Sequence, residues 1–194
     1  MHVAKSFCRV AVDILIDVDG VLADLVGGMC DAFEARGMPV PARIRQCLAT
    51  PMLEDALPFA YRARVKEILS EPGFVSGLDW YTGARTFLRV LKEMRHNVIA
   101  LTAPYAPSST WMAERTEWLA SVLAPKQIIF CPSSEKWRVG GDVLIEDRAD
   151  IALQWKHTNP GGKAILINRP WNQEPTHGHL HRAESYASIL EHVL

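Results

Sequence analysis

The pattern of hydrophobic positions predicts two regions with different secondary structure. Residues 10–18 form a mostly apolar, β-branched run, which is typical of a strand buried on both faces. Residues 21–79 show only helix-like spacing, interrupted by prolines and glycines, and carry no strand pattern. We expect a small all-helical insert here, with helices at 24–36, from Pro41 through Gln46, between Pro51 and Pro58, and at about 59–70.

From residue 80 onwards, strand-like and helix-like segments alternate. The expected strands lie at 97–101, 127–130, 143–145 and 164–167, and the expected helices at 83–94, 108–124, 151–156 and 185–194. Ser108 can cap the second of these helices, on which Trp111 and Trp118 share one face and should be core residues. Such alternation predicts an α/β fold, in which helices cover both faces of a parallel sheet.

Length, composition and charge fit a globular protein without a bulk attraction to nucleic acid or membrane. The 194 residues suffice for one domain plus an insert, and the formal net charge is −1. No apolar stretch reaches membrane-spanning length, and Asp13 interrupts the first apolar run, which argues against a signal peptide. The four cysteines lack a C-x-x-C pair, so we expect reduced thiols in a cytoplasmic protein: Cys8, Cys30, Cys47 and Cys131.

The first predicted strand ends in Asp17-Val18-Asp19-Gly20, which is the first chemical signal in the chain. Side chains two apart on a strand point the same way, and ligands of α/β sheets bind at the carboxyl ends of strands. Two adjacent carboxylates suit one hard cation, or a division of roles between nucleophile and acid/base. The alternative is an ordinary pair of surface aspartates.

Later strand ends supply further polar residues. Thr102, Lys136 and Glu146-Asp147 follow in that order, each at or near the end of a predicted strand. Alone, the threonine could satisfy a backbone group, the lysine could be solvated, and the acids could begin a helix. Together with Asp17 and Asp19 they supply a nucleophile, an acid, a hydroxyl donor, a cation and a metal ligand. Phosphoryl transfer requires this set, since it depends on positioning and charge neutralisation.

The order of these motifs resembles the haloacid dehalogenase superfamily of aspartate-nucleophile phosphatases. More narrowly, the chain resembles the 5′(3′)-deoxyribonucleotidase family in the segments Asp17–Asp24, Gly27-Gly28, Phe33, Pro72-Gly73-Phe74, Gly83-Ala84, Thr102-Ala103-Pro104 and Asp142–Arg148. The resemblance implies a Rossmann-like core made of residues 1–20 and 80–194. Residues 21–79 would then form a helical cap inserted after the first strand.

The resemblance also implies roles for individual residues. Asp17 would be the nucleophile that forms an aspartyl-phosphate, and Asp19 would be the general acid and base. Mg²⁺ would be held by Asp17, the Asp19 carbonyl and Asp147, with support from Glu146. The residues expected to bind substrate are Thr102 and Lys136 at the phosphate, Phe74 at the nucleoside, and also Ala103 and Arg148.

Three departures from the family pattern concern substrate handling. Leu25 stands where the animal enzymes have a base-stacking aromatic residue, Ala103 where they have serine, and Ser134 where an arginine is expected. The reaction class therefore stands, while the base, the sugar and the 5′ or 3′ preference stay open. The leading interpretation is a Mg²⁺-dependent phosphatase for a (deoxy)nucleoside monophosphate.

Other functions remain as alternatives. One is a phosphatase for another small phosphoester or a polynucleotide end; another is a non-enzymatic phosphate-binding module, since fold does not determine function. A short cap closes over a small molecule more readily than over a duplex, so we do not expect nucleic acid as a partner. Asp19 argues against mere binding, which needs no proton donor.

The oligomeric state is open, a homodimer included. His177, His179 and His181 could bind a transition metal, but a solvated or structural role is the favoured interpretation.

Overall fold

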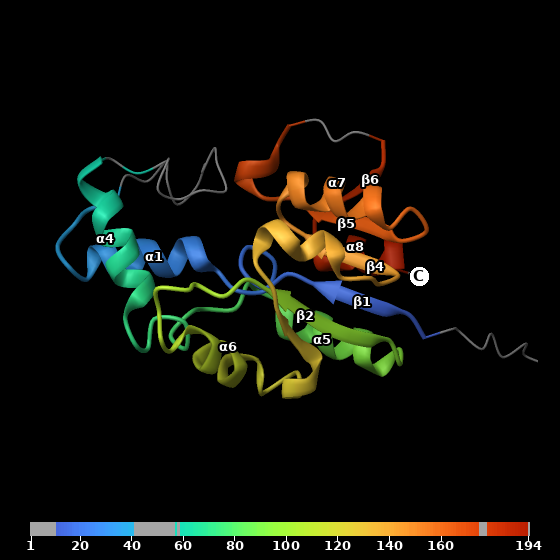
Figure 1. The fold of residues 1–194 in the computed structure, drawn as a ribbon, viewed down its shortest axis with the longest axis horizontal. Helices are drawn as coiled ribbons and strands as arrows, with labels where there is room; N and C mark the ends of the chain where they lie inside the picture. Colours follow the sequence, from blue (N-terminus) through green and yellow to red (C-terminus); the bar gives the residue numbers. More distant parts are fainter. Residues whose placement is uncertain (1–10, 41–56, 58, 175–177, 194) are drawn as a thin grey trace, which may run out of the picture.

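The computed structural model describes residues 11–40, 57, 59–174 and 178–193. Within these ranges a six-stranded, fully parallel sheet has the strand order β3-β2-β1-β4-β5-β6 (Figure 1). The strands are β1 (Asp13–Ile16), β2 (Asn97–Thr102), β3 (Ile128–Phe130), β4 (Val143–Glu146), β5 (Lys163–Ile167) and β6 (Leu180–Ala183). The predicted parallel sheet is confirmed, and β1 lies near its centre, between β2 and β4.

Helices surround this sheet and also form the inserted part of the chain. The α-helices are α1 (Leu25–Glu34), α4 (Phe59–Ser70), α5 (Ala84–Glu93), α6 (Trp111–Leu119), α7 (Ala149–Thr158) and α8 (Tyr186–Val193). Three short 3₁₀ helices lie in the connections that follow α6, β3 and β5, respectively: η1 (Pro125–Gln127), η2 (Ser133–Arg138) and η3 (Pro170–Asn172). Figure 1 shows α1 and α4 together beside the sheet, away from α5, α7 and α8.

Both faces of the sheet are covered, which explains the apolar first strand. Ile14 and Ile16 of β1 belong to the same buried cluster as Phe87 of α5 and Ile189 of α8. Leu15 points to the opposite face, where Trp155 of α7 is completely buried. Because alternate strand residues face opposite sides, a strand covered on both sides needs apolar residues at successive positions.

The inserted helices have a hydrophobic cluster of their own. Met29, Cys30 and Phe33 of α1 pack with Val65 and Ile68 of α4. We call α1 and α4 with this cluster the cap. The domain boundaries at 21 and 79 stay a prediction.

Two chain segments connect the cap to the sheet, and they lie side by side. The Asp24 amide donates to the Asp79 carbonyl at 2.9 Å, and the Tyr81 amide donates to the Leu22 carbonyl at 2.9 Å. Leu22, at the start of the predicted insert, is buried in the cluster on the α5 side of the sheet. The chain therefore leaves the sheet and returns to it at one place.

Several element predictions differ from the structure. The helices predicted from Pro41 through Gln46 and between Pro51 and Pro58 lie outside the described residues, apart from Leu57. Thr110, not Ser108, precedes α6, and Ser108 lies in the turn before it, where its amide donates to the Tyr105 carbonyl at 3.0 Å. The helix also ends at Leu119, before the extended residue Ala124 that precedes Pro125.

The sequence patterns gave no indication of β6. Only Leu180 and Ala183 of this four-residue strand are buried, so its pattern lacks the apolar run of the inner strands. Its parallel pairing with β5, and not its local sequence pattern, makes this segment a strand of the sheet. No helix among the described residues is long and apolar enough to cross a membrane.

Candidate active site

The strand ends that carry the predicted site residues meet at one edge of the sheet. Ile16 of β1 is in register with Ala100 of β2 and with Ile145 of β4. The residues that follow in each strand therefore lie close together, and the Asp17 amide donates to the Ile145 carbonyl at 2.9 Å. This arrangement arises because all three strands run in the same direction, so their carboxyl ends coincide.

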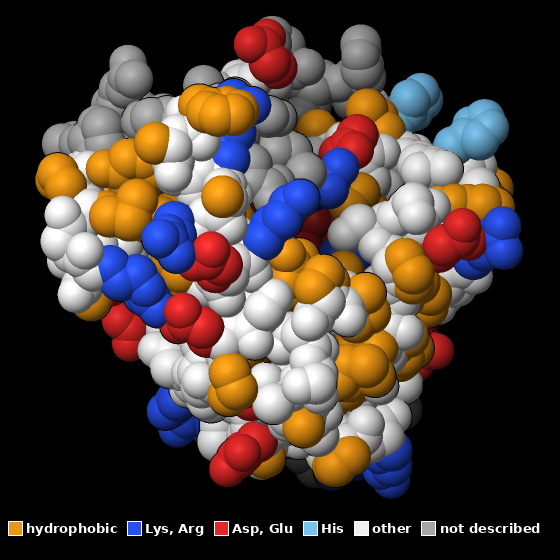
Figure 2. Space-filling model, turned by 60° about the vertical axis from the view of Figure 1, so that its left-hand side comes forward, with side chains coloured by type: hydrophobic (Ala, Val, Ile, Leu, Met, Phe, Trp, Pro, Cys, Tyr) orange, Lys and Arg blue, Asp and Glu red, His pale blue; other side chains and the backbone are white. Residues whose placement is uncertain are grey.

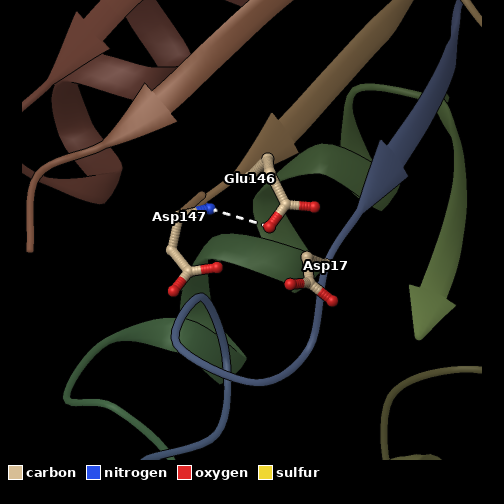
Figure 3. A group of neighbouring side chains, drawn as sticks. All are labelled: Asp17, Glu146 and Asp147. Atoms are coloured by element: carbon tan, nitrogen blue, oxygen red, sulfur yellow. Dashed lines mark hydrogen bonds between the residues drawn. The ribbon is translucent and has the colours of Figure 1, made fainter. Parts of the chain in front are cut away.

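Three carboxylates converge at this edge (Figure 3). Asp17 comes from the end of β1, while Glu146 and Asp147 come from the end of β4. All three are buried, and each offers an oxygen that lies within 4.8 Å of the others. Oxygen ligands at such spacing suit a hard divalent cation, whose charge would also relieve their mutual repulsion.

Lys136 of η2 is the cation already present in this cluster. Its Nζ lies 2.7 Å from Asp17 Oδ1 and 3.0 Å from Glu146 Oε2, and its side chain is buried. Burial lowers the pKa of Lys136, but the charges of Asp17 and Glu146 outweigh burial and raise that pKa well above its usual range. The lysine is therefore charged at any physiological pH, and one positive charge faces three carboxyl groups.

Burial and the excess negative charge of this cluster raise the pKa values of two of its acids, Asp147 and Glu146. Burial, with the Asp17 charge added to it, raises the pKa of Asp147 to about 6. The same two causes raise the pKa of Glu146, although Lys136 opposes them. An incompletely neutralised group of buried acids fits a divalent cation, which supports the predicted metal-binding residues.

Two side chains of η3 hold Asp147 in place. Trp171 Nε1 donates to Asp147 Oδ2 at 2.8 Å, and Asn172 Nδ2 donates to the Asp147 carbonyl at 2.7 Å. Gly20 adopts φ 80° beside them, and a Cβ there would lie 2.2 Å from Asp147 Oδ2. The turn after β1 thus needs glycine for its backbone conformation and for space.

Asp19 faces a different partner. Its Oδ1 lies 2.5 Å from Nη2 of Arg115, a fully buried residue of α6, and the Asp19 side chain is 22% exposed. Burial raises the pKa of Asp19, while the Arg115 charge opposes that rise. The Asp19 side chain is not part of the three-carboxylate group, and the metal contact through its backbone carbonyl stays a prediction.

A cavity of about 360 Å³ opens over these groups. Its lining includes the charged residues Asp17, Asp19, Lys136, Asp147 and Arg148. The apolar part of the lining comes from the cap residues Leu25, Val26, Met29, Val65 and Leu69 and from Pro104, Tyr105, Trp111, Ile151 and Trp171 outside the cap. Figure 2 shows a hollow on this face of the molecule with acidic atoms in its depth.

The other predicted substrate residues are placed differently. Ala103 and Arg148 line the cavity, and Arg148 Nη2 pairs with Asp150 Oδ2 at 2.6 Å. Thr102 is fully buried, and its Oγ1 has no hydrogen-bond partner in the part of the chain that the structure describes. A buried hydroxyl without a partner at this edge suits a ligand oxygen. Phe74 packs between the cap and the sheet and does not line the cavity, so its contact with a nucleoside stays a prediction.

The histidines predicted from the sequence do not join a metal-ligating group among the described residues. His177 lies outside those residues, and His179 is exposed. His181 lies on β6, where its ring packs against His192 with 5.0 Å between ring centroids. The structural or solvated role of the three histidines stays a prediction.

Sequence reasoning missed Arg115 and Trp171, which hold two of the predicted site residues. A signal for Arg115 was present, because it lies four residues after Trp111 and three before Trp118 and therefore shares their buried face. The chain offered no such signal for Trp171, since the 3₁₀ turn that carries it has no periodic pattern.

Comparison with known proteins identifies the family of this chain. The family model described as "5′ nucleotidase, deoxy (Pyrimidine), cytosolic type C protein" matches residues 10–194. The chain belongs to this 5′-nucleotidase family. A Bordetella pertussis protein that carries the name of a 5′(3′)-deoxyribonucleotidase is 29% identical over 171 residues, covering 84% of this chain and 87% of that protein. The human cytosolic-type 5′(3′)-deoxyribonucleotidase is 28% identical over 159 residues, covering 76% of this chain and 78% of the human protein.

The fold of this nucleotidase-family chain is shared with solved haloacid dehalogenase-type hydrolases. YfnB from Bacillus subtilis, solved with magnesium bound, superposes with a TM-score of 0.62 at 13% identity, covering 96% of this chain and 99% of that one. The predicted Rossmann-like α/β fold is thus confirmed. This chain, as a member of the 5′-nucleotidase family, is a phosphoric monoester hydrolase, which confirms the prediction from the motif order.

Proposed function

We propose that this enzyme hydrolyses (deoxy)nucleoside monophosphates with Mg²⁺, through an aspartyl-phosphate on Asp17. The observation that carries the proposal is the origin of the cavity-lining residues: the core supplies the charged residues Asp17, Lys136 and Asp147, while the cap supplies apolar residues. The charged residues suit a phosphate group, and the apolar cap residues suit the sugar and base. A cavity of about 360 Å³ is within the range of small-molecule sites.

In the first step, Asp17 attacks phosphorus. Asp17 Oδ1 accepts hydrogen bonds from Lys136 Nζ and from the Val18 amide, both at 2.7 Å. These contacts hold the carboxylate in one orientation, so its other oxygen is available for attack. The new bond joins Asp17 to phosphorus as the ester P–O bond breaks, and its electron pair leaves with the nucleoside oxygen. That oxygen takes a proton from Asp19, whose raised pKa suits a general acid.

In the second step, water attacks the phosphorus of the aspartyl-phosphate. Asp19, now ionised, takes the proton from that water, and the bond between Asp17 and phosphorus breaks. Phosphate and the free Asp17 carboxylate are the products. We assign the contacts with the phosphoryl oxygens, which carry charge in both transition states, to Lys136, which lines the cavity, and to the unpartnered hydroxyl of Thr102.

We assign the metal to the buried acids Asp17 and Asp147, with the Asp19 carbonyl and with Glu146 in support. Bound there, Mg²⁺ would neutralise phosphate charge and orient the group for in-line attack. Oxygen-only ligands favour Mg²⁺ over thiophilic ions. Trp171 and Asn172 contribute by keeping Asp147 in the orientation that the cluster requires.

The proposed substrate is a deoxynucleoside monophosphate bound with loose preference for the base. Family membership supports the nucleotide, and the leucine at position 25 supports the loose preference, because this cavity-lining residue offers no aromatic face there. We also propose a cytoplasmic location, supported by the name of the human cytosolic-type relative. Light scattering would measure whether the chain forms a homodimer.

The test compares the wild type with the Asp17→Asn variant. Phosphate release should be measured with Mg²⁺ on the four deoxynucleoside monophosphates, a hexose phosphate, phosphoserine and a 5′-phosphorylated oligonucleotide. We expect the highest kcat/KM on a mononucleotide and no turnover by Asp17→Asn, because an amide is a poor nucleophile toward phosphorus. Asp142→Asn is the matched control, since Asp142 is exposed at the opposite end of β4. A higher kcat/KM on the hexose phosphate, on phosphoserine or on the oligonucleotide than on every mononucleotide would overturn the nucleotide assignment.

A further inference from the structure

Arg115 is an unusual residue to find in a protein core. Its side chain is completely buried, with the rings of Trp111 and Trp118 at 5.5 and 5.4 Å from the guanidinium carbon. Its Nη2 contacts Asp19 Oδ1 at 2.5 Å, whereas its Nε and Nη1 have no hydrogen-bond partner among the described residues. Burying a charged group with so few partners costs free energy, and hydrophobic residues commonly stabilise a core better. Packing alone therefore gives a poor account of an arginine at this position.

The residue before Arg115 contacts the cap's connection to the core. Glu114 accepts hydrogen bonds from the backbone amides of Gly73, Val75 and Ser76, at 2.8, 3.0 and 3.2 Å. These three amides belong to the segment that follows α4 and leads the chain from the cap back to the sheet. Burial raises the pKa of Glu114, but hydrogen bonds from the Thr110 side chain and from these amides outweigh burial and lower that pKa, so the contact is made by a carboxylate.

Helix α6 holds the same returning segment at a second point. Trp118 Nε1 donates to the Leu78 carbonyl at 2.8 Å, and the Trp118 ring stacks on Trp80 with 3.7 Å between centroids. One short helix thus binds the chain that leaves the cap through Glu114 and Trp118, and binds Asp19 through Arg115. The position of α6 relative to the sheet affects both contacts together.

We propose that Arg115 is a positioning residue for Asp19, and that the Glu114–Arg115 pair couples the seating of the cap's returning segment to the orientation of this carboxyl group. The two aromatic rings restrict the guanidinium, and the guanidinium restricts Asp19, which is otherwise 22% exposed at the cavity. Orientation matters because proton transfer needs Asp19 within hydrogen-bond reach of the leaving oxygen. This inference rests on the proposed role of Asp19 as the acid.

The decisive experiment uses two leaving groups. Hydrolysis of a nucleoside monophosphate or of β-glycerophosphate expels an alkoxide, which needs the Asp19 proton. Hydrolysis of 4-nitrophenyl phosphate expels a stable phenolate, which does not need that proton. The value of kcat/KM reports the steps up to release of the leaving group. We expect Arg115→Met to lose about 10-fold or more in kcat/KM on the alkyl esters, a part of the roughly 10²–10⁴-fold contribution of general acid–base catalysis. The loss on 4-nitrophenyl phosphate should be several-fold smaller.

Three further variants distinguish positioning from a purely structural role. Arg115→Lys keeps a positive charge and should recover part of the alkyl-ester activity. Glu114→Gln weakens the contact with the returning segment and should show the same dependence on leaving group, with a smaller loss. The control is Glu117→Gln, at an exposed position of the same helix, which should match the wild type on every substrate.

A double-mutant comparison completes the test. If Arg115 acts through Asp19, then adding Arg115→Met to the Asp19→Asn variant should cause little further loss on alkyl esters. Equal losses on the alkyl and aryl esters, or additive losses in the double variant, would overturn the proposal. If Glu114→Gln lost kcat/KM equally on the alkyl and aryl esters, the coupling to the cap would be overturned. If the wild type hydrolyses β-glycerophosphate but no nucleotide, the proposed substrate fails while this test of Arg115 still gives an answer.

Discussion

Replacing Lys136 with methionine should destabilise the protein because of the acids around it. The ammonium group lies 2.7 Å from Asp17 Oδ1 and 3.0 Å from Glu146 Oε2, and Asp147 completes a group of three buried carboxyl groups. Methionine keeps the length of the side chain but leaves this group without its positive charge. Removing one partner of a buried ion pair costs about 3–5 kcal/mol. Domains are typically stable by about 5–15 kcal/mol, so the loss is a large share of the total.

The cost should depend on pH, and its sign follows from the acids. Burial already raises the pKa values of Glu146 and Asp147. Without Lys136 these values rise further above those of the unfolded chain, so the folded variant binds more protons than the unfolded one. Its stability relative to the wild type therefore falls as pH rises. We expect close to the full loss of about 3–5 kcal/mol near pH 8 and a smaller loss near pH 5, where the acids are protonated.

Urea unfolding followed by circular dichroism, in EDTA and then with Mg²⁺, measures this prediction. Mg²⁺ should restore part of the lost stability near pH 8, because it supplies positive charge to the same oxygens. Lys126→Met is the matched control, since Lys126 is exposed on η1. The reasoning is wrong if the two variants unfold at the same urea concentration, or if the Lys136 variant is equally destabilised at both pH values.

Three more predictions concern the metal and the substrate. EDTA should abolish turnover and Mg²⁺ restore it, and calorimetry should show weaker Mg²⁺ binding as pH falls through about 6, because Asp147 must be deprotonated to bind a cation; an affinity independent of pH would contradict this. Trp171→Phe keeps a ring but removes the donor to Asp147, so the Kd for Mg²⁺ should rise about 10-fold or more, and an unchanged Kd would refute the positioning role. Leu25→Phe should lower KM for at least one deoxynucleoside monophosphate, since stacking on a base contributes about 1–3 kcal/mol; four unchanged KM values would count against it.

Local sequence patterns were sufficient to predict the parallel sheet and the order of its chemical groups. The apolar run before Asp17 and the segment before Glu146-Asp147 each encode a strand buried on both faces, because such strands need apolar residues at successive positions. Parallel strands bring their carboxyl ends to one edge, so the predicted convergence of Asp17, Thr102 and Glu146 followed from topology alone. The edge strand β6 was missed because two of its four residues are not buried, which removes the pattern.

Tertiary structure decided which side chains hold the predicted residues in place. Arg115 contacts Asp19 across 96 positions of sequence, and Trp171 contacts Asp147 across 24. Periodicity reports only which face of an element is buried, so it indicated that Arg115 lies beside Trp111 and Trp118 but not what its guanidinium meets. The partner of a buried charge depends on how the elements pack. For this protein, packing places α6 between the cap's returning segment and Asp19, and places η3 against Asp147.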